Sequence, residues 1–215
     1  MVDITNQEIY ENTNEILKKK KKYVINKKYV TDKPITLYFK LEKSYSSKYF
    51  VLDENNNKVF IYKYGAFNKD HQILDLNKNV LATFNINNID KNLKNGNFSI
   101  EFTEIKHQPT ITFKNSSSYK IPNYIFNVSD NDNGERLLNA VFDKDSSTIS
   151  IYNGTTEDEN QLICQYERKK RHNIEDKWPL KILADNDILF SICINLMACV
   201  IADKISNLAW SLYFL

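Results

Sequence analysis

Hydrophobic residues occur along most of the chain in short runs that clusters of Asn, Asp and Lys separate. Short runs rich in β-branched and aromatic residues between turn-forming clusters predict β-strands. The predicted strands are residues 35–41, 49–52, 59–64, 73–76, 80–86, 97–102, 110–113, 124–128, 137–142, 148–152, 161–166 and 178–183. Polar clusters at 53–57, 77–79 and 143–145 predict hairpins between neighbouring strands, because Asn and Asp favour tight turns.

The last hydrophobic run, ILFSICINLMACVIA at residues 188–202, is uncharged and too long for a typical strand. Asp187 precedes it and Asp203 follows it. As a helix it spans roughly 22 Å, which is shorter than the ~30 Å hydrocarbon core of a bilayer. A helix that is apolar on every face must be surrounded by lipid or by protein. We therefore expect a helix buried in protein.

A closed sheet satisfies both patterns, because closure removes the strand edges and can bury the helix. The sequence predicts a mainly β fold: an antiparallel barrel of about twelve strands that encloses a hydrophobic C-terminal helix at about residues 187–203. We assign residues 34–215 to this single domain. Residues 1–33 form a polar, lysine-rich extension in which a short helix is expected between Asn6 and Leu17.

The chain is nearly neutral, with 29 Lys and Arg against 27 Asp and Glu. Any attraction to polyanions must therefore come from local clusters. Cys164, Cys193 and Cys199 give an odd count, and the last two point to different faces of the expected helix. Reduced thiols and a polar N-terminus without a signal peptide predict a cytoplasmic protein. We also expect a monomer.

Two basic clusters are candidates for binding anionic headgroups, since Arg offers bidentate contacts to phosphate and Lys a point charge. The first is an unbroken lysine run, and the second directly follows a predicted strand. Their members are Lys18, Lys19, Lys20, Lys21 and Lys22, and Arg168, Lys169, Lys170 and Arg171. The alternative for both is a solvated surface that binds nothing.

Three stretches carry a family resemblance: ITLYFKLEKSYSSKYFVLDENNNKVF, HQILDLNKNVLATF and DNDILFSICINLMACVIAD. They resemble the opening strand and hairpin, the next hairpin and the closing helix of the LURP-one-related proteins. That family shares a barrel fold with tubby C-terminal domains and phospholipid scramblases. The resemblance implies the same barrel around a helix, and no binding residue is carried over from tubby domains.

By resemblance to tubby domains, we expect a non-enzymatic module that binds anionic lipid, in particular phosphoinositide, peripherally at a cytoplasmic membrane face. A soluble protein-interaction or scaffold domain is the alternative. A scramblase-like or tail-anchored membrane protein is a further alternative. The resemblance gives little support to scramblase activity. Scramblases have an acidic segment ahead of their last helix, and in this sequence only Asp185 and Asp187 stand there.

Catalytic and metal-binding motifs are missing from the sequence. Glycine occurs only at positions 65, 96, 134 and 154, so neither a P-loop nor a dinucleotide fingerprint can be written. Asp130-x-Asp132-x-Gly134 fails as a calcium loop, and His71, His107 and His172 are scattered. We expect no enzyme activity, no cofactor and no metal. The sequence also has no known nucleic-acid-binding pattern.

Overall fold

The computed structural model describes residues 27–43, 46–64, 70–89, 95–116, 123–130, 134–143, 147–155, 161–167 and 177–213 of the chain. These residues form a short 3-10 helix, twelve strands and one long helix. The elements are η1 (Lys27–Tyr29), β1 (Ile35–Leu41), β2 (Lys48–Leu52), β3 (Lys58–Tyr64), β4 (His71–Leu74), β5 (Val80–Ile89), β6 (Asn95–Phe102), β7 (Thr110–Asn115), β8 (Asn123–Asp130), β9 (Gly134–Phe142), β10 (Thr148–Asn153), β11 (Leu162–Glu167), β12 (Lys177–Ile182) and α2 (Ile188–Tyr213).

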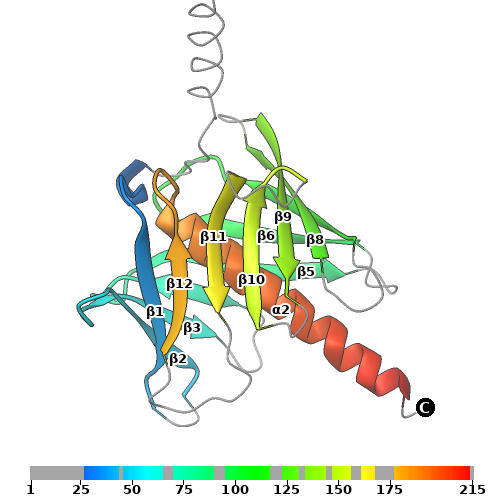
Figure 1. The fold of residues 1–215 in the computed structure, drawn as a ribbon, viewed down its shortest axis with the longest axis horizontal. Helices are drawn as coiled ribbons and strands as arrows, with labels where there is room; N and C mark the ends of the chain where they lie inside the picture. The colour runs from blue at the N-terminus through cyan, green and yellow to red at the C-terminus, as the bar shows by residue number, and fades with distance from the viewer. Residues whose placement is uncertain are drawn as a thin grey trace, which may run out of the picture.

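The strands form one closed antiparallel barrel, and α2 runs through it (Figure 1). Each strand pairs with its neighbours in sequence, and β1 pairs with β12 to close the ring. The predicted fold class, a twelve-stranded barrel around a C-terminal helix, is therefore confirmed. The expected helix near residues 6–17 lies outside the described residues.

The core forms between the inner face of the wall and the helix. Along β1, Leu37 and Phe39 are buried while the neighbouring Tyr38 is partly exposed, as alternation in a strand requires. On α2, the successive residues Ile192, Cys193 and Ile194 have no exposed surface. Because each residue turns the helix by about 100°, burial of three in a row means that the helix is enclosed on every side.

The start of α2 is fixed by Asp187, which is buried. Its carboxylate Oδ1 accepts a hydrogen bond from the backbone N–H of Phe190 at 3.0 Å, as an N-cap residue does. Asp187 also forms a β-bridge with Val30, so the segment after η1 lies across the start of the helix. We call the rim of the barrel at this end the first rim, and the rim where α2 leaves the second rim.

The predicted helix end near Asp203 is wrong, because α2 continues to Tyr213 and projects beyond the strands (Figure 1). The physical reason is that charged and polar residues are tolerated within a helix, whereas Gly and Pro end it. Neither Gly nor Pro occurs after Asp203.

Asp203 lies near Tyr124 at the start of β8, where burial and then this carboxylate raise the pKa of the tyrosine. Among the described residues, no helix combines the length and apolar character needed to cross a membrane.

Two hairpin turns at the first rim have the same construction. Asp53 begins the β2–β3 turn, and its carboxylate accepts hydrogen bonds from the backbone and side-chain N–H groups of Asn57 at 2.8 and 3.0 Å. Asp75 does the same with Asn79 in the β4–β5 turn, at 2.8 Å for both bonds. The repeated Asp-x-x-x-Asn pattern therefore sets where the flanking strands end.

These turns give a pH-dependent prediction. The side-chain amide of Asn79 is the main cause that lowers the pKa of Asp75, and Asn57 does the same for Asp53. Stability from such bonds is present above the carboxylate's unfolded pKa and is lost as pH falls through its lowered folded pKa. Asn79→Ala should raise the pKa of Asp75 and leave Asp53 unchanged in an NMR titration of the carboxyl carbons. An unchanged Asp75 would contradict the role of the amide.

The enclosed helix gives a second prediction. Met197 has no exposed surface, so Met197→Asp would place an unpaired charge among apolar side chains. That cost, several kcal/mol, is comparable with the whole stability of a domain, about 5–15 kcal/mol, and should prevent folding. Met197→Leu, the matched control, should cost less than about 1.5 kcal/mol. Circular dichroism melts test both, and a cooperative melt of the Asp variant near the wild-type temperature would show that the site is not enclosed.

Candidate functional site

The basic residues singled out from the sequence lie outside the described residues. This holds for Lys18, Lys19, Lys20, Lys21 and Lys22, and for Arg168, Lys169, Lys170 and Arg171. Their described neighbours lie at opposite ends of the barrel. Lys27 is at the first rim, where Lys28 pairs with Glu104, whereas Glu167 and Lys177 end β11 and begin β12 at the second rim.

The described strands carry a strongly uneven distribution of charge. Four strands that are contiguous in the ring, β12, β1, β2 and β3, carry six lysines and no Asp or Glu. The other eight strands carry four acidic and two basic residues. We call the outer surface of the four basic strands the lysine face; its lysines are Lys40, Lys48, Lys58, Lys63, Lys177 and Lys181.

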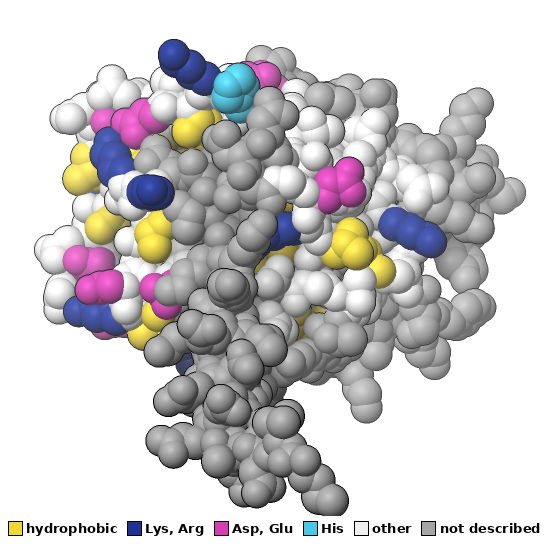
Figure 2. All heavy atoms as spheres, turned by 90° about the horizontal axis from the view of Figure 1, so that it is seen from above, with side chains coloured by type: hydrophobic (Ala, Val, Ile, Leu, Met, Phe, Trp, Pro, Cys, Tyr) yellow, Lys and Arg dark blue, Asp and Glu magenta, His cyan; other side chains and the backbone are white. Residues whose placement is uncertain are grey.

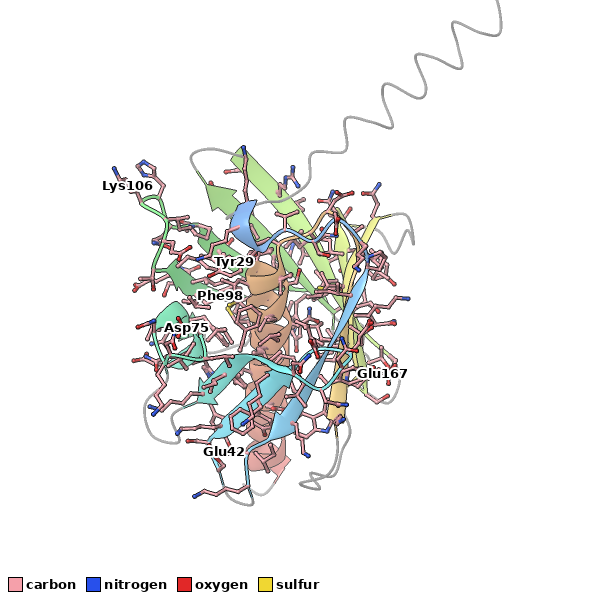
Figure 3. The ribbon with its side chains drawn as sticks, turned by 90° about the vertical axis from the view of Figure 1, so that its left-hand side faces the viewer. Tyr29, Glu42, Asp75, Phe98, Lys106 and Glu167 are labelled. Atoms are coloured by element: carbon pink, nitrogen blue, oxygen red, sulfur yellow. The ribbon has the colours of Figure 1, made fainter. Side chains whose placement is uncertain are left out.

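The strand alternation places these lysines on the outer side of the wall. On β12, Trp178 and Leu180 are buried in the core, so Lys177 and Lys181 fall on the opposite side of the strand. Lys58, Lys63 and Lys181 are exposed and the other three are partly exposed. Figure 3 looks onto β1, β2 and β3 from outside and shows the lower end of this surface near Glu42.

Two carboxylates at the edges of the lysine face, Glu42 and Glu54, accept hydrogen bonds from neutral donors. Glu42 accepts a hydrogen bond from the Ser46 hydroxyl at 3.1 Å, and Glu54 accepts one from the backbone N–H of Thr36 at 3.2 Å. Within the described part of the chain, none of the six lysines forms an ion pair with a carboxylate. The lysine face therefore presents positive charge that this part of the chain does not neutralise.

The surface of the barrel seen from above does not have the one-sided charge of the lysine face. Figure 2 shows lysine and acidic side chains interspersed on the described part of that surface. Interspersed charges of both signs cancel within a Debye length of about 8 Å at physiological ionic strength. The charge segregation is thus a feature of four particular strands.

Asn195, a buried polar residue of α2, hydrogen-bonds through its amide nitrogen to the helix and to the wall. The Asn195 amide nitrogen donates to the backbone carbonyl of Ser191 at 2.9 Å and to the Cys164 sulfur at 2.7 Å. The amide nitrogen of Asn195 is therefore satisfied, whereas its buried Oδ1 has no hydrogen-bond partner among the described residues. Burial, the main cause, raises the pKa of Cys164 to about 12, so this thiol is not a nucleophile at neutral pH.

A tyrosine and a histidine form a polar contact near the second rim. The Tyr62 hydroxyl lies 2.8 Å from Nδ1 of His71, whose ring stacks on Phe84 at 4.8 Å between centroids. Burial raises the pKa of Tyr62 well above its usual value, which opposes formation of a reactive phenolate. The pair packs the wall against the helix. No group of three or more potential metal ligands is gathered among the described residues.

No family model matches the sequence, and neither does any curated protein. The structure is similar to the X-ray structure of a protein from Arabidopsis thaliana, with a TM-score of 0.53. The two share 15% sequence identity, and the match covers 85% of this chain and 98% of the Arabidopsis chain. At this identity the likeness is one of fold.

The buried thiols give a third prediction. Cys164 and Cys193 are buried, and burial raises the pKa of both. A thiol reagent should modify them only when the barrel opens, at least about a thousandfold more slowly than in denatured protein. Stopped-flow absorbance with and without denaturant measures both rates. Rapid labelling of Cys193 in the native protein would mean that α2 is accessible.

Proposed function

We propose that the chain is a non-enzymatic, LURP-one-related and tubby-like module that binds anionic lipid, in particular phosphoinositide, at a cytoplasmic membrane face. The observation that carries the proposal is the segregation of charge in the wall: six strand lysines and no strand carboxylate on four contiguous strands. Such a surface attracts polyanions although the chain has a net charge of only +2.

The magnitude of the attraction suits a peripheral membrane protein. Each Lys or Arg near an anionic leaflet contributes on the order of 1 kcal/mol, and the contribution falls off within a Debye length. A single lysine therefore does little, whereas several on one surface give reversible binding that salt weakens. A second basic cluster directly follows β11, the neighbour of β12, in the sequence: Arg168, Lys169, Lys170 and Arg171. We include these four residues among those that bind the lipid.

Vesicle pelleting tests the function. The full chain should pellet with vesicles that contain phosphatidylserine or phosphoinositide, and it should be released as the salt concentration rises. Replacing Arg168, Lys169, Lys170 and Arg171 with Gln should weaken pelleting by roughly tenfold or more, because about four charges near the leaflet are lost. The melting temperature is the control for folding. Equal pelleting with neutral phosphatidylcholine vesicles would overturn the proposal.

A further inference from the structure

Two pairs of lysines oppose each other directly across neighbouring strands of the lysine face. The strand registers pair Lys40 on β1 with Lys177 on β12, and Lys48 on β2 with Lys63 on β3. Directly opposite side chains have Cβ atoms about 5 Å apart, and like charges at this distance destabilise a sheet. The amino group of Lys177 also donates to the Asn56 side chain, which satisfies a hydrogen bond but leaves the charge in place.

Apolar side chains lie between the two lysine pairs. Phe50 is opposite Lys40 on one side and opposite Ile61 on the other, and both apolar side chains are partly exposed. The amino group of Lys58 lies 3.8 Å from the centroid of the Phe50 ring, a cation–π contact that holds the charge over the aromatic surface. The surface thus combines uncompensated positive charge with an aromatic and an aliphatic group.

We infer that the lysine face is the surface on which this protein docks to an anionic membrane, with Lys40, Lys48 and Lys63 at the headgroups and Phe50 and Ile61 at the headgroup boundary. The inference rests on the proposed function and names the surface that performs it. Lysine stems pack along apolar surface while their charged ends extend into a polar layer. The leaflet relieves the opposed charges that the sheet itself leaves unpaired.

The composition of the lysine face favours a membrane over a nucleic acid or an acidic protein. Its cations are all lysines, which act as point charges on flexible stems. Point charges around a partly exposed aromatic ring match a diffuse anionic surface with an apolar interior beneath it. The outer surface of four adjacent strands also offers a broad area of contact.

The path of α2 leaves the lysine face unobstructed. The helix leaves the barrel beside β8, where Asp203 lies near Tyr124. In the ring of strands, β8 lies across the barrel from the four basic strands. Figure 1 accordingly shows the end of α2 projecting on the side away from β1 and β12. The end of α2 therefore does not cover the lysine face.

A pair of matched double variants tests the location. Lys48→Gln with Lys63→Gln removes one opposed pair, and Lys106→Gln with Lys114→Gln removes the same charge outside the lysine face. The first variant should bind vesicles of phosphatidylcholine with phosphatidylserine at least about tenfold more weakly than wild type, and the control less than about twofold. The first variant should melt at the wild-type temperature or slightly above it, because it loses a like-charge contact.

A second measurement does not depend on mutation. An amine-reactive label applied to vesicle-bound protein, followed by mass spectrometry of peptides, should show protection of Lys40, Lys48 and Lys63 while Lys106 and Lys114 stay reactive. Without vesicles all five should react, because each is at least partly exposed.

The outcomes separate the two proposals. If wild type does not bind anionic vesicles, the proposed function fails. If wild type binds but both double variants behave alike and labelling is uniform, the lysine face is overturned and the proposed function stands. Protection of the lysine face by polyglutamate but not by vesicles would overturn the membrane as its occupant and assign an acidic protein instead.

Discussion

Burial of α2 on all sides is the constraint on which the rest of the structure depends. The described strands would surround an empty space without the helix, and the helix would present apolar side chains to water without the strands. Each is therefore the apolar environment of the other, and neither side can be removed without exposing the other. Because the interior is closely packed, replacing a side chain of the helix or the wall with a smaller one should leave a cavity. The closed wall cannot move inward to fill such a cavity, so the stability of the barrel depends on the volume of each core side chain.

The filled interior moves any binding to the outside of the wall. Inward positions of the described strands are occupied by residues such as Phe39, Phe84 and Phe126, which pack against the core and have almost no exposed surface. Function must therefore use outward positions or loops. Lysine often protects an exposed sheet edge from pairing with other chains. A closed barrel has no such edge, so edge protection does not explain the six lysines of the lysine face.

The strands were predictable because their signals are local. Short runs of β-branched and aromatic residues located all twelve, and clusters of Asn, Asp and Lys marked several of the turns between them. The strand predicted at 73–76 is misplaced, since β4 is His71–Leu74. Asp75 already belongs to the turn, because its carboxylate accepts a hydrogen bond from the backbone N–H of Asn79. The end of α2 was missed because polar residues after Asp203 resembled a stop. The lysine face was also missed, because no local pattern shows which lysines of different strands share one outer surface.

A closed barrel also explains how opposed lysines are tolerated. Each like-charge pair costs at most about 1 kcal/mol relative to neutral side chains, whereas burial of one large apolar side chain contributes about 1.5–3 kcal/mol. The core contains many such side chains, among them Ile73, Ile100 and Ile151, so the fold can carry the repulsion at its surface. The repulsion is absent from any state in which anions lie between the lysines. Free energy that destabilises the isolated barrel slightly is therefore recovered on binding, and it favours the bound state over the free one.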